Sequence, residues 1–378
     1  MKSDLSSLEL NYLVKELEVL VGGKLEQLYQ LGRDEFTMQL HVPSIGKSIL
    51  RIIIGKMMYL ASSKTPAPET PPSFCIYLRK KLKNARIKSI GQLGFERIVE
   101  FVFETKDAQL RLIFELFSKG NVVLCNEEGI ILSILEQQEW KDRTLKPKQH
   151  YEYPKKEFNF LAMTNAELDI MLTKSDKESL VKTLAMDLGL GGVYAEELCR
   201  LSGVDKNIKS NSLSEKEAAS LYLIMQDMIS KQFAPVVVYE DDEKSKVKDI
   251  TPFRLESYRE FAISEFDTFS NALDSVLTSK EHVTAVAAAE KHAKTKIDKI
   301  NEMIEQQTLR IKGLEVSEKE NQRKGEVIYE NYILVQQVLA EINELRKSSS
   351  WQAVKERFKG HKIIRDINDK TGEITLEL

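Results

Sequence analysis

A proline-free segment over residues 283–346 limits the fold of this chain more than any other stretch, because its apolar residues recur at coiled-coil spacing. One heptad register has apolar residues at its a and d positions: Ile297, Ile300, Ile304, Ile311 and Leu314. A second register lies out of phase with the first: Ile328, Val335, Val338, Ile342 and Leu345. At about 1.5 Å per residue, the segment fits one helix of about 95 Å or a hairpin of half that length. Either form leaves an apolar stripe that needs a partner helix, and no other segment clearly offers one.

The chain is too long for a single hydrophobic core. Of its 378 residues, 42% are apolar and 30% are charged, and this charged share exceeds the usual quarter, which favours a long exposed helical element. The formal net charge of −3 gives no overall attraction to nucleic acid. A surface that binds RNA must therefore be a local basic patch.

The cysteines and the N-terminal residues both indicate the cytoplasm. Cys75, Cys125 and Cys199 lie too far apart for a zinc site or a local disulfide pattern, which fits a reducing compartment. The first residues lead into a helix pattern and not into the apolar core of a signal peptide. The best candidate for a membrane span, residues 49–61, is shorter than the roughly 18 residues that cross a bilayer. We therefore expect a cytoplasmic protein without a membrane partner.

Residues 1–163 are predicted to form an antiparallel sheet closed by a few helices. Apolar residues at helical spacing run from Leu10 to Val21, and Gly22-Gly23 ends that helix. Short segments rich in β-forming residues follow: 25–31, 36–41, 49–54, 57–61, 98–103, 110–117, 122–124 and 130–135. Turns typical of hairpins separate them, and four of the nine prolines mark residues 64–72 as a loop.

The rest of the chain alternates between helical and strand-like parts. Residues 164–232 are helical, with a glycine-rich turn at 189–192 that is typical of a helix-hairpin-helix domain. Residues 233–282 return to strand character and are expected to pack on the N-terminal lobe. After the coiled coil at 283–346, residues 347–378 are expected to form a small domain with a helix and a β-hairpin. The predicted fold class is therefore α+β.

The most concentrated charge lies in the basic run from Tyr77 to Lys88, in which six of twelve residues are basic and none is acidic. If its first part is helical, Arg79 and Lys83 lie one turn apart with Lys80 beside them. These three side chains would then form a ridge that binds phosphates. The alternative is an ordinary solvated helix face.

The turn that contains Gly189, Gly191 and Gly192 is a second candidate for phosphate binding, because backbone amides at a helix N-terminus can bind a phosphate. Such turns between helices are also common without a ligand. No lysine of a nucleotide-binding P-loop follows this one.

No catalytic centre is apparent in the sequence. The histidines are scattered without metal-ligand spacing: His41, His150, His282, His292 and His361. No nucleophile elbow occurs, and Glu196-Glu197 has the pattern of a solvated helix face. We therefore expect a protein without catalytic residues, cofactor or metal.

Several short motifs follow one another along the chain. They are Leu5-Ser6-Ser7-Leu8-Glu9; Pro72-Ser73-Phe74-Cys75 with Leu78-Arg79-Lys80-Lys81-Leu82; Gly94-Phe95-Glu96-Arg97-Ile98-Val99; Glu115-Leu116 with Gly120-Asn121-Val122-Val123-Leu124; Leu188-Gly189-Leu190-Gly191-Gly192-Val193-Tyr194-Ala195-Glu196-Glu197; and Gly325-Glu326-Val327-Ile328-Tyr329-Glu330-Asn331-Tyr332. Their ordered set over nearly the whole chain resembles the NFACT family. The resemblance implies an N-terminal lobe related in fold to formamidopyrimidine-DNA glycosylases, a helix-hairpin-helix domain, a coiled coil and a small middle domain.

The resemblance also implies a function in ribosome-associated quality control. Proteins of this family bind a large ribosomal subunit that still carries peptidyl-tRNA, and they help to recruit the tRNA for untemplated extension of the stalled chain. The expected partners are therefore tRNA and the large ribosomal subunit, and no hydrolytic site is needed. Two other hypotheses are a coiled-coil adaptor without RNA affinity and a DNA glycosylase. The glycosylase would need an N-terminal proline amine and an adjacent glutamate, which Met1-Lys2-Ser3 does not supply.

The same resemblance points to residues that engage tRNA. The family usually has an Asp-Arg pair where this chain has Glu96-Arg97, and an aspartate where it has Glu9. Carboxylate and guanidinium are retained, although the extra methylene moves the acid by about 1.5 Å. From the residues alone, Ser6 and Glu9 also fit a capping box, and Arg97 also fits a cross-strand ion pair.

Family members commonly continue beyond the position of Leu378, with a returning helix and a further RNA-binding domain. We expect such a segment, or another partner helix, to lie on Ile297, Ile304 and Ile311.

Overall fold

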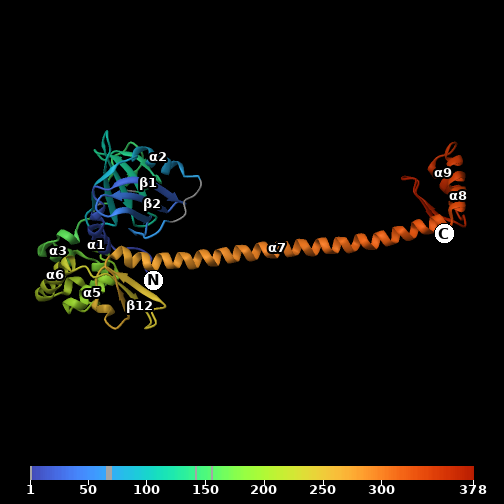
Figure 1. Ribbon diagram of the computed structural model, residues 1–378. Coiled ribbons are helices and arrows are strands. Elements are labelled where there is room, and N and C mark those ends of the chain that lie inside the picture. Colours follow the sequence, from blue (N-terminus) through green and yellow to red (C-terminus); the bar gives the residue numbers. More distant parts are fainter. Residues whose placement is uncertain (1, 65–69, 141–142, 155) are drawn as a thin grey trace. The chain divides into compact units, whose positions relative to one another are not determined.

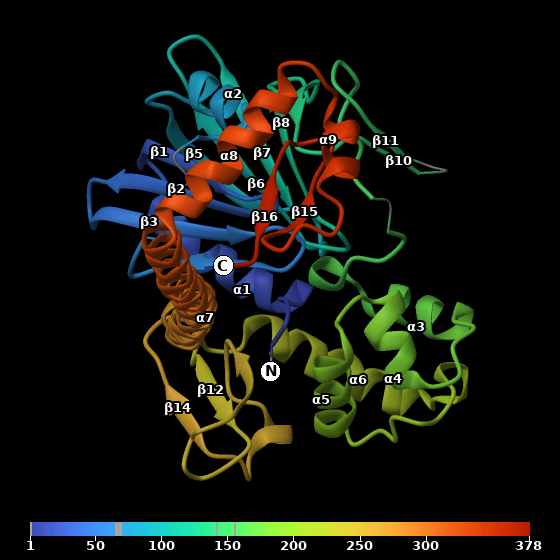
Figure 2. The same cartoon turned by 90° about the vertical axis from the view of Figure 1, so that its right-hand side faces the viewer.

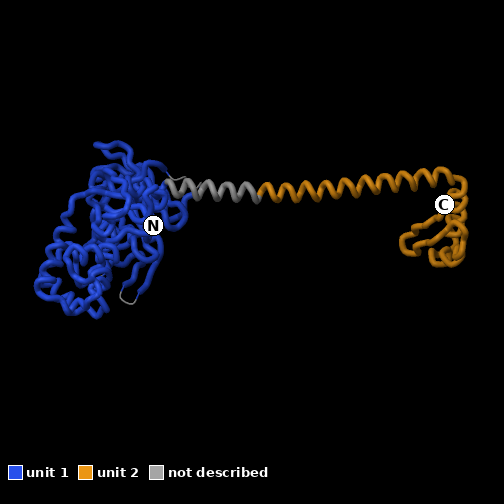
Figure 3. The backbone as a smooth tube through the Cα atoms, turned by 90° about the horizontal axis from the view of Figure 1, so that it is seen from below, with its two compact units in different colours: residues 1–283 blue, residues 284–378 orange. Residues whose placement is uncertain are grey.

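The computed structural model describes residues 2–64, 70–140, 143–154 and 156–378 (Figure 1). The chain divides into two compact units, residues 1–283 and 284–378, and helix α7 contributes to both (Figure 3). Within the first unit, Figure 2 shows a large sheet, a group of helices and a small sheet, with the start of the chain between them.

The large sheet has nine strands, and every strand pairs antiparallel with its neighbours in the order β4-β3-β2-β1-β5-β6-β7-β8-β9. The strands are β1 Lys24–Leu31, β2 Glu35–Val42, β3 Gly46–Ile53, β4 Met57–Leu60, β5 Arg86–Gln92, β6 Ile98–Glu104, β7 Gln109–Glu115, β8 Asn121–Asn126 and β9 Ile131–Ile134. All strands predicted from the sequence are present. Strand β5 was not predicted, because its residues lie at the end of the basic run and offer only two apolar side chains, Ile87 and Ile90.

Two helices pack against this sheet: α1 Ser7–Leu17 and α2 Ser73–Lys81. Helix α1 begins where the sequence placed its capping box, and it continues as a 3-10 turn, Glu18–Leu20, before the predicted glycines. Helix α2 ends at Lys81, which corrects the expectation that Arg79 and Lys83 lie one turn apart on it. The chain turns at Asn84, whose φ is positive, and so Lys83 lies beyond the helix.

The helical group comprises α3 Asn165–Lys174, α4 Leu180–Lys182, α5 Gly192–Ser202 and α6 Glu215–Ser230. A π-helical turn, Thr183–Asp187, joins α4 to the glycine-rich turn. These elements enclose a hydrophobic core of their own, to which α1 contributes Leu8 and Tyr12.

Residues between the helical group and α7 form a three-stranded sheet in the order β13-β12-β14. The strands are β12 Val236–Tyr239, β13 Val247–Thr251 and β14 Ile263–Glu265, and a separate hairpin pairs β10 Gln138–Trp140 with β11 Arg143–Leu145. Val237 and Ile250 belong to the core of the large sheet, whereas Phe253 and Leu255 belong to the core of the helical group. This segment therefore holds the two cores of the first unit together.

Helix α7 runs without interruption over Phe269–Glu330, and α8 follows over Tyr332–Arg346. The segment is therefore not a hairpin. The first apolar register is 55% to 62% exposed at each of its members: Ile297, Ile300, Ile304, Ile311 and Leu314. Within the described part of the chain, none of the helices is both long and apolar enough to cross a membrane.

The second apolar register is exposed at Ile328 on α7 but largely buried at its members on α8. On α8, Val338 and Ile342 pack against α9 Trp351–Arg357 and against the hairpin of β15 Ile364–Ile367 and β16 Ile374–Leu376. These positions belong to the core of a small domain and lie apart from the exposed stripe on α7. The α+β class, with its large antiparallel sheet and long helix, is confirmed.

Candidate functional site

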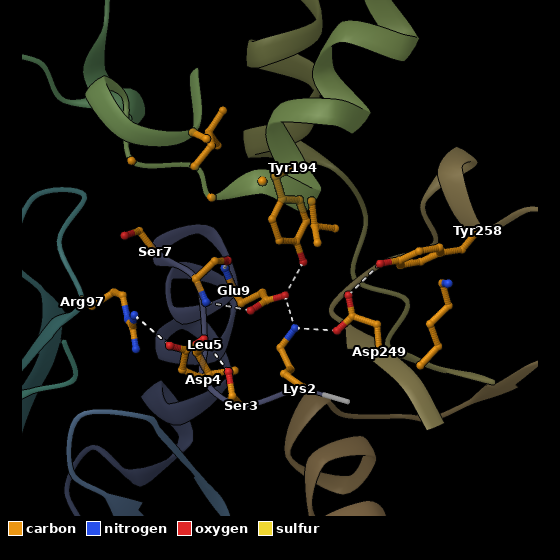
Figure 4. A pocket seen from close by; sticks show the side chains of 18 residues that line it. Lys2, Ser3, Asp4, Leu5, Ser7, Glu9, Arg97, Tyr194, Asp249 and Tyr258 are labelled. Carbon is orange, nitrogen blue, oxygen red and sulfur yellow. Dashed lines mark hydrogen bonds and ion pairs between the residues drawn. The ribbon is translucent and has the colours of Figure 1, made fainter. Parts of the chain in front are cut away.

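A pocket of about 470 Å³ opens where the N-terminal arm (residues 2–6, which precede α1), the glycine-rich turn and strand β13 meet (Figure 4). Its walls include residues 2–7, the turn at 189–194 and the β13 region. It brings together several of the residues proposed from the sequence: Glu9, Arg97, Gly189, Gly191 and Gly192. Segments that are distant along the chain therefore meet at one site.

A buried network of charges forms one wall of the pocket. Lys2 Nζ lies 2.5 Å from Glu9 Oε1 and 2.9 Å from Asp249 Oδ1. The Tyr194 hydroxyl donates to Glu9 Oε1 at 2.7 Å, and the Tyr258 hydroxyl donates to Asp249 Oδ2 at 2.9 Å (Figure 4). These contacts tie the N-terminal arm to α5 and to β13.

Glu9 is 2% exposed, and both of its carboxylate oxygens have partners. The Ser6 amide donates to Glu9 Oε2 at 2.8 Å, while the Glu9 amide donates to Ser6 Oγ at 3.2 Å. The capping box predicted from the sequence is therefore confirmed. Because its other oxygen is used by Lys2 and Tyr194, Glu9 in this arrangement positions the arm and α1.

The protonation states of the network are set by burial and by the two carboxylates. Burial disfavours the charge on Lys2, but Glu9 and Asp249 outweigh it and raise the pKa of Lys2 above its ordinary value of 10.5. Burial, followed by the charge of Glu9, raises the pKa of Tyr194, and burial with Asp249 does the same to Tyr258. At neutral pH the amine is a cation and both hydroxyls are neutral. The amine is thus a fixed charge and not a nucleophile.

Arg97 stands just before β6, where the amide of Leu116 donates to its carbonyl at 2.7 Å and fixes its backbone. Its Nη1 lies 3.3 Å from Asp4 Oδ2, and its Nη2 donates to the Gly55 carbonyl at 3.2 Å. Its acidic partner thus lies on the N-terminal arm and not on a neighbouring strand. Its Nε has no hydrogen-bond partner among the described residues. That Nε is buried, but each terminal nitrogen carries two N–H groups and has one partner, so the spare donors of Arg97 beside the pocket are on Nη1 and Nη2.

Glu96 does not line this pocket. Its Oε1 lies 2.8 Å from Lys156 Nζ, and it belongs to a neighbouring cavity of about 290 Å³. The same ammonium reaches the glycine-rich turn, because a β-carbon at Gly189 would lie 2.6 Å from Lys156 Nζ. Glu96 therefore places Lys156 against the turn, and no motif in the sequence pointed to this lysine.

The glycine-rich turn presents the N-terminus of α5 to the pocket. Gly189 and Gly191 both have φ of +79°, a conformation that L side chains rarely adopt, and Gly191 caps the helix without a side-chain hydrogen bond. A β-carbon at Gly192 would meet no atom within 4 Å. The first turn of α5 carries no acidic residue, so its amides and the helix dipole favour a negative ligand.

Lys248 is a further cation on the pocket wall. Its Nζ lies 4.3 Å from the centre of the Phe261 ring. Three basic and three acidic side chains line the pocket, and Lys2, Glu9 and Asp249 are engaged with one another. Lys248, Arg97 and the α5 amides are therefore the groups that can meet an anion.

The residues proposed on the basic run lie elsewhere, since none of them lines the pocket. Arg79 Nε donates to the Leu28 carbonyl at 2.6 Å, and its guanidinium lies 5.1 Å from the centre of the Tyr29 ring. Lys80 and Lys83 are exposed and have no ion-pair partner among the described residues. They belong to a separate surface.

One expectation about a carboxylate was wrong. Glu196 is exposed and pairs with Lys206, but Glu197 is fully buried. Glu197 accepts the amides of Glu256 at 2.6 Å and Ser257 at 2.9 Å, and so caps the 3-10 turn Glu256–Tyr258. Adjacent residues on a helix point in different directions, so a pair of glutamates need not share one solvated face.

Within the described ranges, no group of three His, Cys, Asp or Glu side chains gathers as metal ligands.

Comparison with known proteins gives consistent matches. A family model described as NFACT N-terminal and middle domains matches residues 6–372. The chain is 30% identical over 398 residues to the archaeal Rqc2 homolog aRqcH of Methanocaldococcus jannaschii, covering all of this chain and 58% of that protein. It is 24% identical over 363 residues to the human ribosome quality control complex subunit NEMF, covering 90% of this chain and 34% of NEMF. The chain thus spans little more than half of the archaeal relative and about a third of the human one.

Among solved structures, the N-terminal part of the fibronectin/fibrinogen-binding protein from Streptococcus suis superposes with a TM-score of 0.58 at 22% identity. The match covers 73% of this chain and all of that one. At this identity, the likeness establishes a shared fold.

Proposed function

Since this chain belongs to the NFACT family, we propose that it is a factor of ribosome-associated quality control that binds tRNA and the large ribosomal subunit in the cytoplasm. The relatives that it matches are named as Rqc2 homologues and as subunits of a ribosome quality control complex. In this role the protein supports untemplated extension of the stalled chain by binding, and the ribosome performs the chemistry.

The observation that carries the proposal is the convergence of positive groups on one pocket. The terminal nitrogens of Arg97 keep unused N–H donors there, the N-terminus of α5 faces the same space, and Lys248 adds a further positive charge. Phosphates of an RNA backbone are the ligands that arginine, lysine and free helix amides bind together. The pocket is thus suited to one part of a tRNA backbone.

The buried network gives the pocket its shape. Lys2 holds Glu9 and Asp249 in place, so the arm and β13 keep a fixed position around the positive groups. We propose that Glu9 acts on tRNA through this positioning, that Glu96 acts through Lys156, and that Arg97 makes the direct contact. Arg79, Lys80 and Lys83 are proposed as a second contact on a different surface.

The test is tRNA binding by the purified chain at 50 and 200 mM salt. The variants are Arg97→Ala and, as a matched control, Arg200→Ala. The control removes an exposed arginine in the last turn of α5, the helix whose N-terminus faces the pocket. A grip on about six phosphates loses affinity on the order of a thousandfold over this salt range. We expect Arg97→Ala to weaken binding and to reduce the salt slope by about one contact, with Arg200→Ala close to the unchanged protein.

Two results would contradict the proposal. Binding that hardly depends on salt, or no binding at all, would favour a protein-binding adaptor over a tRNA-binding factor. Equal affinities for Arg97→Ala and Arg200→Ala would remove Arg97 from the interface.

A further inference from the structure

A second pocket, of about 390 Å³, lies directly beside the first, and the two share Ser3 and Asp4 of the N-terminal arm as a common wall. The turn between β3 and β4 contributes Gly55 and Lys56 to its lining, and the turn between β7 and β8 contributes Lys119. The sequence did not single out any of these residues.

The two turns form a fixed base for their lysines. A β-carbon at Gly55 would lie 2.8 Å from the Ser118 carbonyl oxygen, and one at Gly120 would lie 2.3 Å from the Gly55 nitrogen. Both glycines have positive φ, and so does Ser118, at +54°. Because the two backbones touch where no side chain fits, Lys56 and Lys119 start from neighbouring, well-defined positions.

The unpaired charges in this pocket are mainly positive. Arg33 pairs with Glu136, and Asp4 is engaged by Arg97. Lys56 and Lys119 are exposed and have no ion-pair partner among the described residues. The remaining acid, Asp34, lies 3.9 Å from Arg33 and is mostly exposed.

Arg97 connects the two pockets. One of its terminal nitrogens faces Asp4 on the shared wall, and the other donates to the Gly55 carbonyl in the second pocket. A polyanion that reaches Arg97 from the first pocket therefore meets Lys56 and Lys119 next.

We infer that the second pocket takes a continuing stretch of the RNA phosphate backbone, with Lys56 and Lys119 as its contacts. The inference rests on the proposed function, because it extends the same grip on tRNA. A phosphate backbone is favoured over a single small anion, since the positive groups are spread over two adjoining pockets. Two exposed lysines neutralise phosphates without reading bases, so the contact adds affinity for any tRNA sequence.

The experiment compares the double variant Lys56→Ala/Lys119→Ala with a matched control, Lys106→Ala/Lys216→Ala. The control removes two exposed lysines that line neither pocket and have no ion-pair partner among the described residues. tRNA affinity is measured at several salt concentrations from 50 to 200 mM, with the unchanged protein and Arg97→Ala in the same series. Circular dichroism checks that each variant is folded.

Loss of two phosphate contacts lowers the salt slope by about 1.4 to 1.8. The ratio of the tRNA affinity at 50 mM salt to that at 200 mM salt should then be roughly 7 to 12 times smaller for the double variant than for the unchanged protein. The control should keep the slope of the unchanged protein. An unchanged slope in the Lys56/Lys119 variant, while Arg97→Ala still weakens binding, would overturn this inference alone. Absence of tRNA binding by the unchanged protein would overturn the proposed function and this inference with it.

Discussion

The buried network at the N-terminal arm makes a prediction about stability that depends on its charge balance. Lys2 contacts two carboxylates, Glu9 and Asp249, so the three groups together carry one excess negative charge. Lys2→Met leaves two buried carboxylates facing each other without a cation. Glu9→Gln instead leaves a matched pair of Lys2 and Asp249. The amide oxygen can still accept a hydrogen bond from Tyr194, but the amide nitrogen can no longer accept one from the Ser6 backbone.

The two substitutions should therefore differ in cost. Breaking a buried ion pair by removing one partner costs about 3 to 5 kcal/mol, which we expect for Lys2→Met. Glu9→Gln exchanges a charged acceptor for a neutral one and should cost about 1.5 to 3 kcal/mol. When Glu9→Gln is added to Lys2→Met, it also removes one of the two unpaired charges. The double variant should therefore be no less stable than Lys2→Met alone, so the two effects are not additive.

Urea and thermal unfolding followed by circular dichroism measure these differences. For a unit of this size, about 1 kcal/mol corresponds to roughly 2 to 4 °C, so Lys2→Met should lower the midpoint by about 6 to 20 °C. Ser6→Ala is the control, because it removes one capping hydrogen bond and no charge and should cost about 1 kcal/mol. A cost below about 1 kcal/mol for Lys2→Met, or strictly additive effects, would refute the buried arrangement of these charges.

Two further predictions concern charge at the same arm. Asp4→Asn releases Arg97 from an exposed ion pair worth about 0.2 to 1 kcal/mol. The affinity for tRNA, measured in binding titrations, should therefore rise about 1.5- to 5-fold. Unchanged affinity would mean that Asp4 does not compete with RNA for Arg97. Because the pKa of Lys2 is raised above 10.5, the stability that its charge contributes is complete below pH 10.5 and is lost as the pH rises through the folded pKa. The difference in unfolding free energy between the unchanged protein and Lys2→Met should therefore narrow above that pH, and a constant difference would contradict the assignment.

Much of the fold could be predicted because its signals are local. Short segments rich in β-forming residues marked eight of the nine strands in the large sheet, and Ser6 with Glu9 marked the start of α1. Strand β5 lacked such a signal, because basic and small residues separate its two apolar side chains. Lys83 was assigned to α2 for a related reason. The chain turns after the helix at Asn84, which has a positive φ, and no glycine at this position indicated the turn in the sequence.

The candidate site could be predicted only in part. Resemblance to a family supplied Arg97 and Glu9, and the glycine pattern supplied the turn before α5. Lys2 and Asp249 were missed because they are 247 residues apart and their contact forms only in the folded protein. Glu197 was misread because its partners, the amides after Leu255, become close only when the two segments pack.

The pairing of Lys2 with Asp249 also sets the order in which the molecule is completed during its own synthesis. At about 5 to 20 residues per second, roughly 12 to 50 s separate the addition of Lys2 from that of Asp249, 247 positions later. Throughout that interval the arm has no acid from β13 to hold it, and this wall of the pocket is incomplete. Under the proposed function, a nascent chain completes its first pocket only after most of residues 1–283 have been made.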